Sequence, residues 1–184
     1  IYTYSNVKPI QKDPALRIKK INTSVDDKSI QLSWKIIPQA TKYEIFRDDK
    51  FLSETEGETY LDTTTNPGDK YCYQIMAFGK YGVTGVLSES YCNSSLTGSP
   101  ESISGTVNKN NITIKWDPVR GASKYNIKQN NKTIGYSSEP IYDDGGLDFS
   151  TNYYYTISSI SANGVEGLFS EVYEIRTRDY VEPP

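Results

Sequence analysis

Apolar and polar residues alternate along several short stretches of the chain. Ile30, Leu32 and Trp34 alternate with polar residues, and Tyr43 and Ile45 do the same. A period of two residues places successive side chains on opposite faces of a β-strand. Clusters of Asp, Asn, Gly and Pro separate these stretches, as tight turns require. Because no period of 3.6 residues is sustained, the pattern predicts an all-β fold of short antiparallel strands arranged as a sandwich.

The predicted strands follow the same plan in both halves of the chain. In the first half we expect strands around residues 16–21, 30–34, 43–47, 59–62, 71–77 and 86–93. In the second half we expect them around residues 103–107, 112–116, 125–128, 141–143, 153–160 and 168–177.

An offset of 82 residues relates the two halves without a gap, as from Trp34 to Trp116. A fixed offset through scattered aromatic, Gly and Ser positions indicates internal duplication. The sequence therefore predicts two domains, at 15–94 and 100–178, with a junction at 95–99 and linkers at 1–14 and 179–184. Eight aromatic residues are expected to build the two cores: Trp34, Tyr43, Tyr71, Tyr73, Trp116, Tyr125, Tyr153 and Tyr155.

The order of these residues resembles the fibronectin type III family. A Trp ends the second predicted strand, and a Tyr-x-Ile begins the third strand nine residues later. A Tyr-x-Tyr-x-Ile strand, a Gly-containing loop and a Ser-Glu pair follow. The resemblance is to the kind found in bacterial extracellular enzymes and surface proteins. It implies two tandem immunoglobulin-like sandwiches, which identifies a fold and not a function.

The same resemblance implies a tyrosine corner in each repeat, with Tyr71 and Tyr153 bonded to nearby backbone. Leu147 lies six residues before Tyr153, as the family motif requires. Thr65 stands at the equivalent place before Tyr71, so the first repeat departs from the motif.

Cys72 and Cys92 are the two cysteines of the chain, and each lies ten residues from Gly82. If the strands around them form a hairpin centred on Gly82, the two residues face each other at close to disulfide distance. Alternation with Tyr71 and Tyr73 turns Cys72 outward, which favours a disulfide over two buried thiols. A disulfide implies an oxidising compartment, so we expect an extracellular protein.

Composition narrows the possible functions. The chain has no His, which removes His-dependent triads and His metal sites. A net charge of −3 does not favour nucleic acid, and no apolar run is long enough to span a membrane. We therefore expect no enzyme activity and no cofactor.

Two acidic clusters are candidate chemical sites. Glu54, Glu56 and Glu58 lie on a predicted connection, where a solvated loop explains them better than a catalytic pair. Asp143, Asp144 and Asp148 supply oxygen ligands of the kind that Ca²⁺ prefers, but a tight turn also uses Asp and Gly. The sequence leaves calcium binding there open.

Strand alternation also predicts a candidate partner surface. If Tyr43 and Ile45 point inward, Phe46 points outward, and Met76 and Phe78 lie outward on the neighbouring strand. Large apolar side chains on an outer face suggest contact with another domain or protein, although scattered surface hydrophobics need no explanation.

The predicted function is a non-catalytic tandem module within a larger secreted or cell-surface protein. It would act as a spacer or scaffold, with neighbouring domains of the same protein as its partners. The alternative is a recognition module for a protein or glycan.

Overall fold

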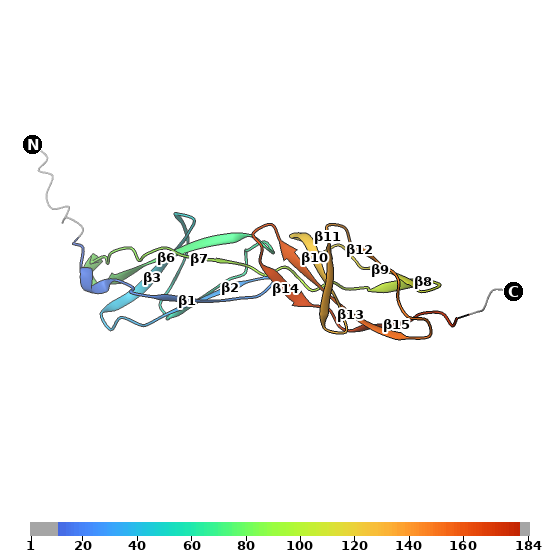
Figure 1. Ribbon diagram of the computed structural model, residues 1–184. Coiled ribbons are helices and arrows are strands. Elements are labelled where there is room, and N and C mark those ends of the chain that lie inside the picture. Colours follow the sequence, from blue (N-terminus) through green and yellow to red (C-terminus); the bar gives the residue numbers. More distant parts are fainter. Residues whose placement is uncertain (1–10, 181–184) are drawn as a thin grey trace, which may run out of the picture. The chain divides into compact units, whose positions relative to one another are not determined.

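The computed structural model describes residues 11–180, and the predicted linkers at 1–14 and 179–184 lie mostly outside that range (Figure 1). The described residues form two compact units. The first holds residues 11–25, 29–65 and 70–93, and the second holds residues 26–28, 66–69 and 94–180. The residues predicted as a junction, 95–99, group with the second unit.

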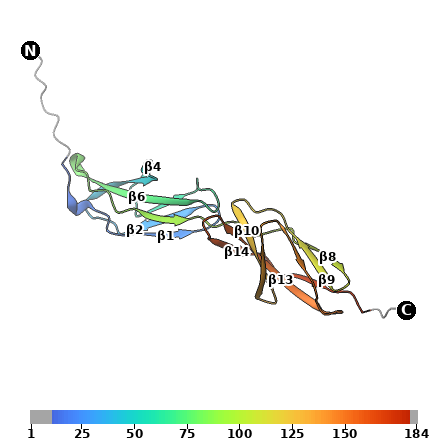
Figure 2. The same ribbon diagram turned by 45° about the horizontal axis from the view of Figure 1, so that its top comes forward.

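The first unit is a sandwich of two antiparallel sheets. One sheet has the order β1-β2-β5, and the other has the order β4-β3-β6-β7. Figure 2 shows β1 and β2 in one layer and β4 and β6 in the other. The strands are β1 (Ile21–Val25), β2 (Ile30–Trp34), β3 (Ala40–Arg47), β4 (Lys50–Thr55), β5 (Thr59–Asp62), β6 (Lys70–Gly79) and β7 (Tyr91–Ser94). Two short 3-10 turns accompany them, η1 (Pro14–Leu16) and η2 (Lys80–Gly82).

The second unit repeats this plan. One sheet has the order β12-β9-β8, and the other has the order β11-β10-β13-β14, with β15 also paired to β13. The strands are β8 (Ser104–Asn108), β9 (Asn111–Lys115), β10 (Ala122–Gln129), β11 (Lys132–Ser137), β12 (Ile141–Asp144), β13 (Asn152–Ser161), β14 (Glu166–Phe169) and β15 (Tyr173–Arg176). The predicted all-β fold of two antiparallel sandwiches is confirmed.

Each unit has its own aromatic core built in the same way. Trp34 packs edge-on against Tyr43 with ring centroids 5.4 Å apart, and Trp116 packs on Tyr125 at 5.1 Å. Such pairs add about 0.5–1.5 kcal/mol beyond the burial of their surface. The hydroxyl of Tyr43 accepts the N–H of Ile37 at 2.8 Å, and Tyr125 accepts the equivalent N–H in its repeat at 3.0 Å. The duplicated sequence therefore builds duplicated contacts.

Two strands have no counterpart among those predicted from the sequence. β4 and β11 are edge strands, and most of their side chains are exposed or half-buried. An edge strand that buries neither face has no need for apolar alternation, so it leaves no period-two signal. Glu54 accordingly lies on a strand, not on the connection that was predicted for it.

The first strand of the first sandwich begins later than predicted. Leu16 is buried, but it ends the 3-10 turn η1 and not a strand. Asp13 caps this turn by accepting the N–H of Ala15 at 2.9 Å, and Pro14 follows it. Pro14 starts the turn at the position that lacks an N–H partner in any case. The strand itself starts at Ile21.

The last predicted strand of each repeat is broken. Only residues 91–94 form a strand in the first unit, whereas the second has β14 and β15 with a gap between them. In each repeat, a serine in the irregular segment bonds to the neighbouring strand. The hydroxyl of Ser88 accepts the N–H of Ile75 at 3.0 Å, and that of Ser170 accepts the N–H of Ile157 at 3.1 Å. The hydroxyl thus satisfies a buried strand amide, which explains why the serine recurs in both repeats.

Candidate interaction surfaces

Cys72 and Cys92 form the predicted disulfide. It joins β6 to β7, with the two Cα atoms 4.0 Å apart. Cys92 is exposed and Cys72 is half-buried, so the bond lies on the outer face of the sheet. The counterparts in the second repeat are Tyr154 and Glu174, whose side chains instead share a hydrogen bond of 3.3 Å. A covalent link in one repeat thus occupies the place of a polar contact in the other.

A buried carboxylate joins the two sheets of the first unit. Asp62 is fully buried and accepts hydrogen bonds from the Tyr73 hydroxyl and from Arg47, both at 2.8 Å. It also accepts the N–H and the hydroxyl of Thr64 at 2.9 and 2.7 Å. Burial alone would raise the pKa of Asp62, but these hydrogen bonds outweigh burial and hold its pKa below the usual value. The folded structure therefore favours the ionised form of Asp62.

The second unit repeats this arrangement without the positive charge. The Tyr155 hydroxyl donates to Asp144 at 2.6 Å, and Gln129 donates to the same oxygen at 2.6 Å. Gln129 stands where the first repeat has Arg47. Burial, together with the neighbouring carboxylate, raises the pKa of Tyr155 and that of Tyr73, so both stay protonated donors. These side chains hold the fold together in both units.

The tyrosine corner is present in the second repeat. The hydroxyl of Tyr153 accepts the N–H of Asp148 at 2.8 Å. In the first repeat, Tyr71 is buried and its ring lies under the guanidinium of Arg47, 4.9 Å from the ring centroid.

Two of the three acidic residues that could bind calcium accept hydrogen bonds from other side chains. Asp143 accepts the hydroxyl of Thr113 at 2.5 Å, and Asp144 accepts from Tyr155 and Gln129. Between residues 11 and 180, no three Asp, Glu or Cys side chains gather closely enough to hold a metal ion.

The predicted partner surface lies on β3 and β6. Phe46, Met76 and Phe78 are each half-buried, between inward side chains that are fully buried. Phe46 packs edge-on against Phe51 at 6.1 Å, and the amine of Lys42 lies 5.0 Å from the Phe78 ring. Neighbouring side chains therefore cover part of these three residues and leave the rest exposed.

The second repeat does not present the same face. Ser158 and Ile160, the equivalents of Met76 and Phe78, are 0% and 7% exposed. β14 pairs with β13 at both residues, and Glu166 of β14 accepts the hydroxyl of Ser158. The first unit has only an isolated bridge at Phe78 in that place. The extra strand is the physical reason for the difference.

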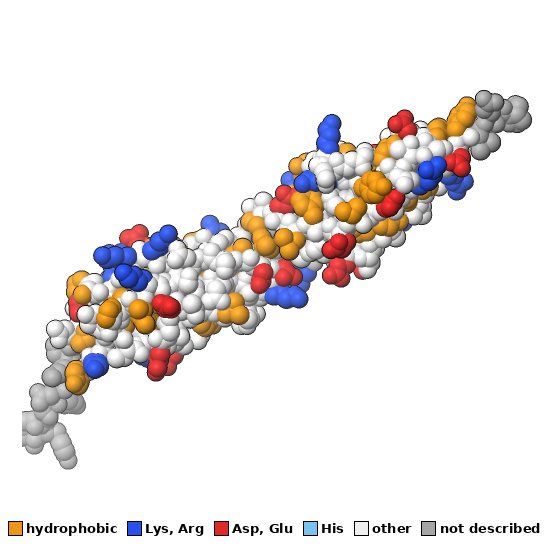
Figure 3. Space-filling model, turned by 90° about the horizontal axis from the view of Figure 1, so that it is seen from below, with side chains coloured by type: hydrophobic (Ala, Val, Ile, Leu, Met, Phe, Trp, Pro, Cys, Tyr) orange, Lys and Arg blue, Asp and Glu red, His pale blue; other side chains and the backbone are white. Residues whose placement is uncertain are grey.

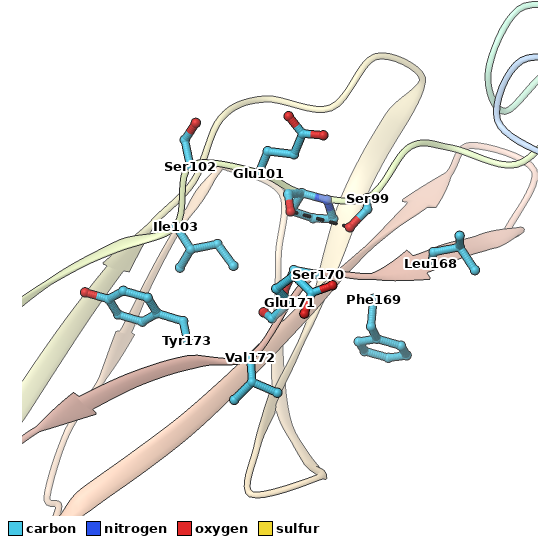
Figure 4. Close-up of a pocket in the computed structure, with 11 residues that line it drawn as sticks. Ser99, Glu101, Ser102, Ile103, Leu168, Phe169, Ser170, Glu171, Val172 and Tyr173 are labelled. Carbon is cyan, nitrogen blue, oxygen red and sulfur yellow. Dashed lines mark hydrogen bonds between the residues drawn. The ribbon is translucent and has the colours of Figure 1, made fainter.

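One groove of about 580 Å³ lies within the second unit (Figure 4). It runs between the segment 99–103 and the segment 168–173, and Leu168 and Val172 beside it are 67% and 61% exposed. In the first unit, the equivalent segments, 17–21 and 86–91, are joined by two side-chain hydrogen bonds. Arg17 donates to Glu89 at 3.0 Å, and the Tyr91 hydroxyl donates to the carbonyl of Lys19 at 2.9 Å. Ser99, which stands where Arg17 would be, is too short to reach across.

A second groove, of about 470 Å³, lies within the first unit between the segments 15–22 and 35–39. Its rim carries four cationic side chains, Arg17, Lys19, Lys20 and Lys35. In the space-filling view, Lys and Arg side chains gather beside hydrophobic ones over the half of the chain nearest the N-terminus (Figure 3).

Within residues 11–180, no helix is long and apolar enough to cross a membrane.

No protein-family model matches the sequence, and no curated protein is similar enough to match it. Among solved structures, the chain is similar to a central fibronectin-III array of RIM-binding protein, with 15% identity and a TM-score of 0.39 over 95% of this chain and 73% of that one. It is also similar to the chicken CNTN1 FN1-FN3 domains, with 16% identity and a TM-score of 0.42 over 92% and 67%. The sixth fibronectin type III domain of a human fibronectin type III domain containing protein 3 shows 20% identity and a TM-score of 0.43 over 50% and 95%. At these values, the description of the fold rests on the strand order and the two cores given above.

Proposed function

We propose that the chain is a non-catalytic tandem module of a larger secreted or cell-surface protein. In that protein it acts as a spacer or scaffold, and its partners are neighbouring domains. The observation that supports this most directly is the duplicated use of polar side chains. Asp62 with Tyr73, and Asp144 with Tyr155, make the same bond in both units. The residues best suited to chemistry are thus engaged in joining the two sheets.

The disulfide supports an extracellular location. Disulfides persist in oxidising compartments and are rare in the cytosol. Cys92 is exposed, and a reducing environment would reach it.

The experiment replaces the module in its parent protein with a flexible Gly-Ser linker of equal length. A spacer should leave the activity of the parent on a small soluble substrate within about twofold, because turnover then needs no fixed spacing. Activity on an immobilised or cell-attached target should fall. Loss of activity on the soluble substrate would mean that the module contributes to the active site, and the proposal would be wrong.

The partly exposed face around Phe46, Met76 and Phe78 favours a recognition role as the second candidate. Replacing Phe46→Lys together with Met76→Ser removes most of its apolar surface. We expect the variant to stay folded and to lose association with a neighbouring domain of the parent, measured by titration calorimetry. Leu61→Lys, on the other sheet and 48% exposed, is the matched control. A folded double variant with unchanged association would exclude this face as the contact.

A further inference from the structure

A groove in the first unit concentrates positive charge beside apolar surface. Arg17, Lys19, Lys20 and Lys35 all line it, and all four are exposed. Ile36, on the same rim, is 51% exposed. We call this feature the basic groove.

Little within the described residues neutralises these charges. Arg17 pairs with Glu89 at 3.0 Å, but both side chains are largely exposed, at 45% and 74%, so water and salt screen the pair. No carboxylate between residues 11 and 180 forms an ion pair with Lys19, Lys20 or Lys35. Like charges gathered on one surface repel each other and raise the local concentration of anions. The basic groove is therefore prepared for a negatively charged partner.

The second repeat shows that the fold does not require these cations. At the positions equivalent to Lys19, Lys20 and Lys35 it has Glu101, Ser102 and Asp117. The second unit nevertheless forms its sandwich, and there the N–H of Asp117 donates to the carbonyl of Glu101 at 3.1 Å. Two of the three positions thus carry the opposite charge in a unit that has the same sandwich plan. The positive charge at these three positions is therefore specific to the first unit, and folding does not account for it.

The apolar rim distinguishes among anionic partners. A sulfated or phosphorylated polymer would use the cations and leave Ile36 in water. An extended polypeptide can place carboxylates on the cations and an apolar side chain against Ile36 and Pro38, because alternate residues point to opposite sides. The methylene stems of the three lysines add apolar surface to the same groove.

From this combination of groove, charge and exposed apolar surface, we propose that the basic groove binds an extended acidic segment of another protein, one in which carboxylates alternate with apolar side chains. This binding does not depend on the module acting as a spacer, and it lies on other residues than Phe46 and Met76.

The test uses the full chain and a short fluorescent peptide in which glutamates alternate with leucines. We expect saturable binding in the micromolar range, as for weak groove recognition of a peptide. Lys19→Glu combined with Lys35→Asp installs the residues of the second repeat and should weaken binding at least about tenfold, since reversed charges repel the glutamates. Lys50→Glu combined with Lys70→Asp makes the same change in net charge on exposed residues outside the groove, and should change binding less than about twofold.

Two further probes separate the possible occupants. A peptide with serine in place of every leucine, and a heparin fragment, should both bind more weakly than the leucine peptide. If either binds as tightly, the groove is a general polyanion site and the proposed occupant is wrong. Absence of saturable binding of the leucine peptide also overturns the proposal, as does unchanged binding after charge reversal.

Amide shifts in the nuclear magnetic resonance spectrum of the unmodified chain locate the contact independently of any variant. They should change mainly at 17–22 and 35–39. Changes centred elsewhere would contradict the assignment even if the peptide binds.

Discussion

At the scale of single residues, the two repeats differ in the partner of an equivalent aspartate. Asp62 has Arg47 beside it, and Asp144 has Gln129. Both repeats form a Tyr–Asp hydrogen bond, and the first adds an ion pair between Arg47 and Asp62 at 2.8 Å. Asp62 is fully buried, whereas Asp144 in the second repeat is partly exposed. A buried carboxylate with a positive partner is costly to disrupt, because the remaining charge loses its compensation.

We predict that Asp62→Asn destabilises the first unit by about 2–3 kcal/mol at neutral pH. Asp144→Asn should cost less, since Gln129 carries no charge. Hydrogen exchange followed by mass spectrometry measures the two units separately in one sample. Equal losses for the two variants would contradict the role given to Arg47.

The same residue makes the stability of the first unit depend on pH. Its pKa is lower in the folded chain than in the unfolded chain, so its contribution is present above the unfolded value of about 4. This contribution is lost as the pH falls through the folded value. Urea unfolding should show that the free energy of unfolding of the first unit falls between neutral pH and about pH 3. In Asp62→Asn, the part of this fall that comes from Asp62 should be absent. An acid dependence that the substitution leaves unchanged would assign the effect to other carboxylates.

At the scale of elements, the last strand is where the repeats differ most. In the second unit, β14 pairs with β13 and covers Ser158 and Ile160. Between residues 11 and 180 of the first unit, the place of β14 holds an isolated bridge between Phe78 and Thr84 and no strand. The disulfide lies further along, where β7 pairs with β6 as β15 pairs with β13. A crosslink at an edge limits the opening of a short strand that has few ladder bonds of its own.

We predict that removing the disulfide destabilises the first unit. The two cysteines are 20 residues apart. Closing a loop of this length stabilises by about 3 kcal/mol in the chain-entropy model. Cys72→Ala combined with Cys92→Ala should therefore raise exchange of the β6 and β7 amides, while the second unit, which has no cysteine, serves as the internal control. Unchanged exchange in β7 would show that the strand is held without the crosslink.

At the scale of the whole molecule, each unit has a separate core. The buried apolar residues form one cluster from Leu16 to Ala77 and another from Ile112 to Ile157. Trp34 belongs to the first cluster and Trp116 to the second, so damage to one core leaves the packing of the other in place.

Trp34→Ala should cost the first unit about 3–5 kcal/mol, the usual penalty for emptying a large aromatic site. That is enough to unfold a small domain of ordinary stability. Residues 100–178 should keep their protection from hydrogen exchange, and Trp116→Ala should give the mirror result. Loss of protection in both units from one substitution would show that they fold as one body.

The sequence by itself determined the duplication, the central strands and the disulfide. A central strand buries one face, so Ile30, Leu32 and Trp34 must alternate with polar residues, and this period can be read without a structure. The pairing of Cys72 with Cys92 followed from their equal distance from Gly82, because a hairpin brings such positions together. These features are local in sequence or repeat at a constant offset.

Only the tertiary structure decided which segments lie at edges and which grooves stay open. β4 and β11 bury little, so no periodic pattern marked them. Ser158 is polar but fully buried, because β14 covers it and Glu166 accepts its hydroxyl at 2.5 Å. The groove of the second unit is open because Ser99 cannot span the distance that Arg17 spans. Burial and groove shape depend on side chains far apart in sequence, and alternation along one strand carries no information about them.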